Sequence, residues 1–255
     1  MVAASFMPKG SADQAPPPLW PAHPTLANYR ELLLGHPVGP VLLDYRIAPA
    51  FLNSLALALL ATAVGTALTV PAGYAFAKLR FRGRERLFRL LLAAAVVPGQ
   101  VAMLPLFLML RQAGLVNSYA GVLAPGLAGI AATLLVRQAA LAIPDEMLDA
   151  ARLDGAGEFA IFARIALPLL SPVAATVALL AFLASWSDFL WPLIMLTDRE
   201  SYTLPVALAA ITREHGGDTE LMMAGAVVTT LPVLILFLAL QRAYLRGILG
   251  GGIKG

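Results

Sequence analysis

The sequence predicts an all-α membrane protein, a bundle of about five transmembrane helices with a helix–turn–helix loop on one side of the membrane. Hydrophobic residues make up 59% of the 255 residues and charged residues only 13%, whereas soluble domains carry roughly 25% charge. The charge-free run 47–77 exceeds the ~20 residues that cross a bilayer. A dense basic run and a charged island separate otherwise apolar segments, as loops between spans do.

Five apolar segments are long enough to be spans, at approximately 47–77, 87–110, 121–142, 173–197 and 221–242. Pro98 and Gly99 interrupt the second segment. Such residues are tolerated in membranes where neighbouring helices or water satisfy the freed carbonyls. We expect a transmembrane domain over 47–246, an extracytoplasmic segment over 1–46 before it, and a cytoplasmic tail over 247–255. Within residues 1–46, a short helix is predicted to begin after Thr25, a good capping residue.

The run KLRFRGRERLFR at 78–89 determines the predicted orientation. It places six basic residues between two apolar segments, and short basic loops between spans belong on the cytoplasmic side. With this loop inside, twelve of the eighteen lysines and arginines are inside and six are outside. The bias predicts an N-terminus outside and a cytoplasmic C-terminus. A nucleic-acid-binding patch is the alternative interpretation of the run.

The charged island over 144–172, PDEMLDAARLDGAGEFAIFARIALPLLSP, predicts two short helices joined by a tight turn. The acids at its start suit a helix N-terminus, so the first helix is expected over 146–154. Gly155 is placed to follow it in a left-handed conformation, which glycine adopts most easily. The second helix is expected over 158–165, with Pro168 ending it.

This island resembles the EAA loop, the cytoplasmic coupling loop of permease subunits of ABC importers. The family pattern is Glu-Ala-Ala, two residues, Asp-Gly-Ala, and then a spaced Ile-x-Leu-Pro. The matching residues are Asp149, Ala150, Ala151, Asp154, Gly155, Ala156, Ile165, Leu167 and Pro168. Asp149 stands where the family has Glu, which keeps the charge and shortens the side chain by one methylene. The resemblance implies that residues 149–156 dock in a groove of an ATPase subunit.

Other segments resemble the carbohydrate-uptake branch of these permeases, and more narrowly the second membrane subunit of maltose- or glycerol-3-phosphate-type systems. They are PTLANYRELL, WSDFLWPLIML, YTLPVAL and QRAYLRGILGGGIKG. The resemblance implies a bacterial inner-membrane protein that forms the translocation path for a sugar or related solute. Family members usually begin with one more transmembrane helix. The start of this chain resembles the sequence that leaves that helix, so we expect the first helix to be missing.

The resemblance also implies the partners. They are a second permease subunit, ABC ATPase subunits, an extracytoplasmic substrate-binding protein and membrane lipid, with no nucleic acid among them. The chain lacks the G-x-x-x-x-G-K-[ST] motif of P-loop ATPases. We therefore expect no cofactor in this chain, and ATP on the partner subunit.

Asp188 is an acid within an otherwise apolar segment, and intramembrane acids suggest function. One interpretation is a contact along the translocation path. The other is an interfacial acid paired within the bundle, with Trp186 and Trp191 in an aromatic belt. Asn53 and Ser54 are interpreted as helix start signals.

Tyr74 and Phe76 are interpreted as packing residues and not as sugar-stacking ones. Catalytic and metal chemistry is not expected. The chain has no cysteine, and its three histidines, His23, His36 and His215, are widely spaced.

Two alternatives to an ABC permease remain. A secondary transporter often shows internal repeats, and none is apparent here. A non-catalytic membrane scaffold is the other. An intramembrane enzyme would need an activated nucleophile, and Ser185 and Ser187 have no histidine within any span. ATP dependence of transport would separate the two transporter interpretations.

Overall fold

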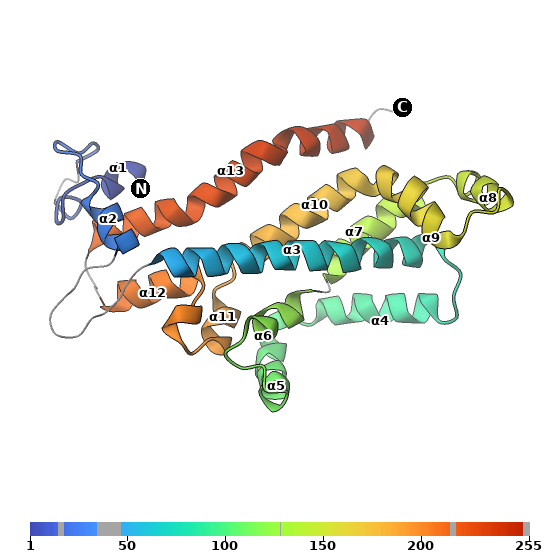
Figure 1. Ribbon diagram of the computed structural model, residues 1–255, viewed down its shortest axis with the longest axis horizontal. Helices are drawn as coiled ribbons and strands as arrows, with labels where there is room; N and C mark the ends of the chain where they lie inside the picture. The colour runs from blue at the N-terminus through green and yellow to red at the C-terminus, as the bar shows by residue number, and fades with distance from the viewer. Residues whose placement is uncertain (15–17, 35–46, 128, 215–217, 252–255) are drawn as a thin grey trace. The chain divides into compact units, whose positions relative to one another are not determined.

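The computed structural model of the chain describes residues 1–14, 18–34, 47–127, 129–214 and 218–251, and the regular secondary structure within them is helical (Figure 1). The helices group into two compact units. Unit 1 contains Met1–Ala56 and Ser187–Ala239, and unit 2 contains Leu57–Trp186 and Leu240–Gly255. The predicted all-α fold is confirmed.

Unit 1 holds the N-terminal segment and the helices that follow residue 187. Its elements are α1 (Val2–Ser5), α2 (Ala27–Leu34), the first turns of α3 (Ile47–Lys78), α11 (Leu190–Met195), the 3-10 turn η3 (Arg199–Ser201), α12 (Leu204–Glu214) and most of α13 (Thr219–Gly251). Thr25 caps α2 as predicted, because its Oγ1 accepts a hydrogen bond from the Ala27 N–H at 3.1 Å. Residues 198–220, which separate the last two predicted spans, contain α12. Its apolar face is buried at Leu204 and Val206.

An ion pair and a hydrogen bond connect the start of the chain to the beginning of α13. Lys9 pairs with Asp218 at 2.8 Å. The buried Glu220 accepts a hydrogen bond from the Ala12 N–H at 2.7 Å. The first residues therefore pack as part of unit 1.

The interpretation of Asn53 and Ser54 as helix start signals is wrong, because α3 begins at Ile47 and both residues lie inside it. Their side chains hold the segment before α12. The Asn53 amide donates to the Tyr202 carbonyl at 3.1 Å, and Ser54 Oγ accepts the Leu204 N–H at 2.7 Å. Both residues therefore join two elements that are distant in sequence.

Unit 2 contains the remainder of α3 and the helices from residue 84 to residue 186. They are α4 (Arg84–Val96), α5 (Gly99–Gln112), α6 (Tyr119–Leu123), the 3-10 turn η1 (Ala124–Gly126), α7 (Ile130–Leu141), α8 (Asp145–Leu153), α9 (Glu158–Ile161), the π-helix η2 (Phe162–Ala166) and α10 (Leu167–Trp186). In Figure 1, α8 and α9 lie at the end of unit 2 where α3 ends and α4 begins.

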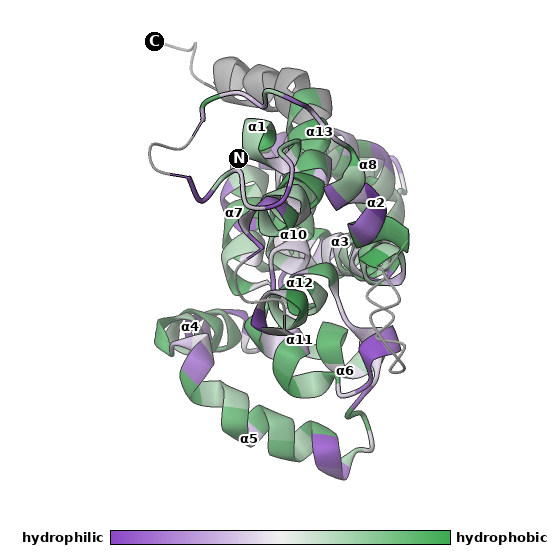
Figure 2. Ribbon diagram, turned by 90° about the vertical axis from the view of Figure 1, so that its left-hand side faces the viewer, coloured by the Kyte–Doolittle hydropathy of each residue, from purple (hydrophilic) through white to green (hydrophobic). Residues whose placement is uncertain are grey.

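Two of the predicted spans are sharply bent helix pairs. α4 and α5 meet at 104°, and the pair from Tyr119 to Leu141 bends by 44°. α5 is apolar along most of its length (Figure 2), and none of its residues is buried. By length and composition, three described helices can cross a membrane, or up to five if each bent pair is one span. The predicted number of five crossings therefore requires both bent pairs to cross.

Pro168 does not end the second helix of the charged island, which corrects the prediction. α9, η2 and α10 run on without a break. The π-helical turn ends at Ala166, two residues before Pro168. Such a turn widens the backbone where the proline ring would clash with a carbonyl of a regular α-helix.

The ends of the last two predicted spans also differ. The segment 173–197 divides into α10 and α11, with a break after Trp186. α13 continues through the predicted tail to Gly251, and residues 252–255 lie outside the described part of the chain.

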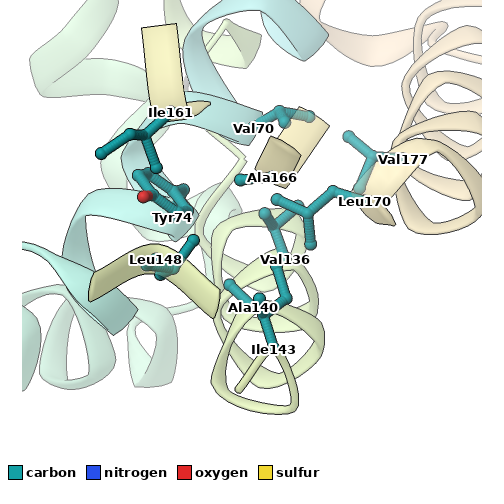
Figure 3. Close-up of a cluster of buried hydrophobic side chains, with 10 residues drawn as sticks. All are labelled: Val70, Tyr74, Val136, Ala140, Ile143, Leu148, Ile161, Ala166, Leu170 and Val177. Carbon is teal, nitrogen blue, oxygen red and sulfur yellow. The ribbon is translucent and has the colours of Figure 1, made fainter. Parts of the chain in front are cut away.

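Buried side chains of α3, α7 and α10 form the core of unit 2 beneath α8 and α9 (Figure 3). The cluster consists of Val70, Tyr74, Val136, Ala140, Ile143, Leu148, Ile161, Ala166, Leu170 and Val177. α3 and α7 lie close together at Gly73, where an added Cβ would lie 2.5 Å from the Cβ of Val136. Small residues permit such approaches between membrane helices. This core positions the charged island.

Candidate functional site: the loop 144–172

A helix and a tight left-handed turn form the first half of the loop. α8 has Asp145 and Glu146 in its first turn, where acids favour the helix dipole. It ends at Leu153, and Gly155 follows with φ +83° as predicted. The Gly155 N–H donates to the Arg152 carbonyl, and the N–H after it donates to Ala151, both at 3.0 Å. These paired bonds form a Schellman motif, which satisfies the last carbonyls of the helix.

Arg152 joins α8 to α9 across this turn. Its Nη1 donates to Asp149 at 2.6 Å, and its Nε and Nη2 donate to the two carboxylate oxygens of Glu158 at 2.7 and 3.2 Å. The bonds to Glu158 and Asp149 raise the pKa of the Arg152 guanidinium above its usual range. The bidentate geometry gives directional strength to a solvent-exposed pair. Asp149, expected to face an ATPase, thus already has a partner within the chain.

Lys78 at the end of α3 fixes the other end of α8. Its Nζ donates to the Ile143 carbonyl and to Asp145 Oδ1, both at 2.6 Å. Only 6% of the Lys78 side chain is exposed, whereas Asp145 is largely exposed. The hydrogen bond from Lys78 lowers the pKa of the Asp145 carboxyl. The loop is therefore connected directly to the last turn of α3.

The inward face of the loop is apolar. Leu148 of α8 and Ile161 of α9 are each 1% exposed and belong to the core. Tyr74, between them in Figure 3, lies 5.2 Å from the ring of Phe162. The interpretation of Tyr74 as a packing residue is confirmed. Phe76 also packs, with its ring 5.6 Å from that of Phe88.

The outward face combines small, acidic and large apolar side chains. Ala150, Asp154 and Gly155 are exposed, while Ala151 and Ala156 are half-buried. Leu153 and Phe159 are 88% and 82% exposed. Sequence reasoning missed these two residues. The sequence does contain a signal for them. Both are apolar residues within a charged island, and helical spacing places them on the side opposite Leu148 and Ile161. An exposed apolar patch with polar neighbours is typical of a protein-docking surface.

Asp188 lies outside this loop, in the break after α10. Its Oδ1 accepts the Trp191 N–H at 3.4 Å, so the side chain stabilises the start of α11. Trp186 and Trp191 are buried, 1% and 6% exposed. They do not form an aromatic belt on the surface of the chain, which corrects that part of the prediction.

The described residues contain no group of three or more His, Cys, Asp or Glu able to hold a metal ion. His36 and His215 lie outside that part of the chain.

The geometry of the loop is that of a presented surface, with two anchored ends and an exposed middle.

Residues 69–249 match the family described as "Binding-protein-dependent transport system inner membrane component". A similar structure is that of a bacterial ABC transporter involved in the import of the acidic polysaccharide alginate. One of its chains has a TM-score of 0.80 and 23% identity, covering 94% of this chain and 87% of that chain. This likeness shows the fold.

Three curated relatives have higher identity. The arabinooligosaccharides transport permease AraQ of Halalkalibacterium halodurans is 38% identical over 80% of this chain and 74% of its own length. AraQ of Bacillus subtilis is 40% identical over 80% and 73%. The lactose transport permease LacG of Rhizobium radiobacter is 34% identical over 78% and 73%.

Proposed function

Since the chain belongs to the family of inner-membrane components of binding-protein-dependent transport systems, we propose that it forms the translocation path of an importer for oligosaccharides or related sugars. The chain is a permease subunit and not an enzyme. The names of AraQ and LacG support the substrate class, because these relatives act on arabinooligosaccharides and lactose.

The observation that carries the coupling role is the outward presentation of residues 149–156. The Schellman turn and the bonds of Arg152 hold their backbone, and Lys78 ties their helix to α3. In the proposed mechanism an ATPase subunit receives this surface, and its movement on ATP binding is transmitted through Lys78 and the core beneath α8. ATP stays on the partner subunit, and this chain needs no cofactor.

The proposed assembly contains a second permease subunit, ABC ATPase subunits and an extracytoplasmic substrate-binding protein. The proposed orientation has the N-terminus outside and the C-terminus in the cytoplasm. The two-to-one distribution of basic residues supports this orientation. It places the loop 144–172 on the side of the membrane where ATP is available.

Uptake by the reconstituted complex tests the proposal. The permease, its partner subunits and the binding protein are placed in proteoliposomes, and entry of labelled oligosaccharides is followed with ATP on the coupling-loop side. We expect uptake only with both ATP and binding protein. Uptake driven by an ion gradient without ATP would indicate a secondary transporter. ATP-driven uptake that excludes every sugar tested would contradict the substrate class alone.

A further inference from the structure

Five arginines line an open pocket of about 750 Å³ between the end of α3 and the first turns of α4. We call it the basic pocket. Its lining residues are Arg80, Phe81, Arg82, Gly83, Arg84, Glu85, Arg86 and Arg89. Because the only acid among them is Glu85, the pocket carries an excess of four positive charges. This excess of positive charge attracts anions to the open surface.

Most of these guanidinium groups have no acidic partner among the described residues. Glu85 pairs with Arg84 at 3.1 Å, and Arg84 also donates to the Leu79 carbonyl. Arg89 donates to the Glu85 main-chain carbonyl, which leaves its charge uncompensated. Within the described chain, no carboxylate lies within 4.0 Å of Arg82 or Arg86, both of which are exposed. Arginine is well suited to phosphate, since its planar fork can donate two parallel hydrogen bonds.

Exposed apolar side chains lie in the lining of the pocket and farther along α4. Phe81 in its lining is 40% exposed and lies 5.9 Å from the ring of Phe76. α4 is mostly apolar beyond its first turns (Figure 2), and Leu90 and Val96 on it are 66% and 81% exposed. A ligand at this place therefore meets a cationic cradle at one end and an unburied apolar helix surface at the other.

We propose that the basic pocket binds the phosphate headgroup of an anionic phospholipid, with the acyl chains lying along the exposed apolar side chains of α4. Clusters of four or more Arg and Lys beside a membrane span attract anionic lipids in this way. A nucleic-acid strand or free phosphate would use the arginines but would leave the leucines of α4 uncovered. The proposal requires only that the chain lies in a membrane, and it is independent of the transported solute.

Native mass spectrometry of the purified full chain in detergent tests the proposal, with phosphatidylglycerol and phosphatidylcholine of equal acyl length as probes. We expect the wild type to bind phosphatidylglycerol at least about tenfold more tightly. Two arginines at a membrane surface contribute roughly 1 kcal/mol each, so Arg82→Gln/Arg86→Gln should weaken phosphatidylglycerol binding on the order of 10- to 30-fold. Arg82→Lys/Arg86→Lys keeps the charge without the planar fork, and should give a smaller loss.

The matched control is Arg111→Gln/Arg213→Gln, which removes the same charge at two exposed arginines that do not line the pocket. It should leave phosphatidylglycerol affinity within about twofold of wild type, because neither side chain is among those that line the pocket. Equal loss in the control, or no preference for the anionic lipid, would overturn the proposal. Displacement of bound lipid by inorganic phosphate or by a single-stranded oligonucleotide would also overturn it, in favour of a free-anion or nucleic-acid site. If the glutamine variant loses its helical circular dichroism, the lysine variant and the wild-type lipid preference decide.

Discussion

Gly155 is the residue whose backbone conformation shapes the presented loop. Its φ is +83°, whereas Gly157 two residues later has φ −71°, and a Cβ would meet nothing within 4 Å at either position. A side chain would therefore have room at both positions, and the two glycines differ only in backbone conformation. A left-handed conformation costs a side-chain-bearing residue roughly 1–2 kcal/mol, and more if it is β-branched.

We predict that Gly155→Val uncouples ATP hydrolysis from transport or prevents docking of the ATPase, while Gly157→Val does neither. The valine would reorganise the Schellman turn and shift α8 relative to α9. The measurements are co-purification of the ATPase subunit and ATP-driven uptake in proteoliposomes. Normal coupling in the Gly155→Val protein would remove the main support for the role of residues 149–156.

Gly73 and Gly65 lie on the same helix and differ in what surrounds them. A Cβ at Gly73 would lie 2.5 Å from Val136 Cβ and 3.0 Å from the backbone nitrogen of Arg137, whereas one at Gly65 would lie 3.6 Å from the Leu127 carbonyl oxygen. We predict that Gly73→Ala lowers the free energy of unfolding by about 1–3 kcal/mol through overpacking. Gly65→Ala should be neutral or slightly stabilising. Thermal unfolding in detergent measures the stability of both variants. Equal melting temperatures for Gly73→Ala and Gly65→Ala would contradict this packing of α3 on α7.

At the scale of elements, α3 and α12 depend on a hydrogen bond formed by one hydroxyl. Ser54 Oγ accepts the buried Leu204 N–H. We predict that Ser54→Ala destabilises the protein by about 1–3 kcal/mol, because that donor is left unsatisfied. Hydrogen exchange should increase in the peptide 199–214. Thr62→Ala is the control, since the Thr62 hydroxyl bonds only to the Ala58 carbonyl of its own helix among the described residues. If exchange over 199–214 is unchanged in Ser54→Ala, the hydroxyl does not hold α12.

α8 depends in the same way on Lys78. Lys78→Met removes the donor to both the Ile143 carbonyl and Asp145, whereas Asp145→Asn removes only the charge of an exposed partner. We predict faster hydrogen exchange over 144–157 in Lys78→Met and a clearly smaller change in Asp145→Asn. An equal effect of both substitutions would show that the ion pair, and not the buried carbonyl bond, anchors α8.

The pKa of Asp145 gives this anchor a defined pH dependence. The pKa is lowered by Lys78, so the ion pair contributes fully above the ordinary carboxyl pKa and is lost as pH falls through the lowered value. Exchange over 144–157, corrected for intrinsic rates, should therefore be constant between about pH 6 and 8.

At the scale of the whole molecule, the 104° angle between α4 and α5 is compatible with a broken span or with a re-entrant pair. A broken span would place the turn at Gly114 outside, and a re-entrant pair would leave it inside. We predict that reporter fusions after Arg84 and after Gly155 are cytoplasmic and that a fusion after Gly114 is external. A cytoplasmic signal after Gly114 would make the pair re-entrant and reduce the number of spans. An external signal after Arg84 or Gly155 would overturn the orientation.

Features that depend on composition or on neighbouring residues could be predicted from the sequence alone. Apolar length indicated the long helices, because crossing a bilayer requires about 20 apolar residues wherever they pack. Thr25 and Gly155 indicated a helix start and a helix end, since capping involves atoms only a few residues apart. The loop itself was recognisable because its pattern of small and acidic residues is contiguous.

Features that depend on contacts between distant segments were decided only by the tertiary structure. The polar segment 198–220 contains a helix because α3 supplies the partner of Leu204, 150 residues away in sequence. The bonds from Lys78 to the start of α8 span 65 and 67 residues. Leu148 is buried and Leu153 is exposed, although both are leucines with the same hydropathy. The difference comes from the core beneath α8, which only Leu148 contacts.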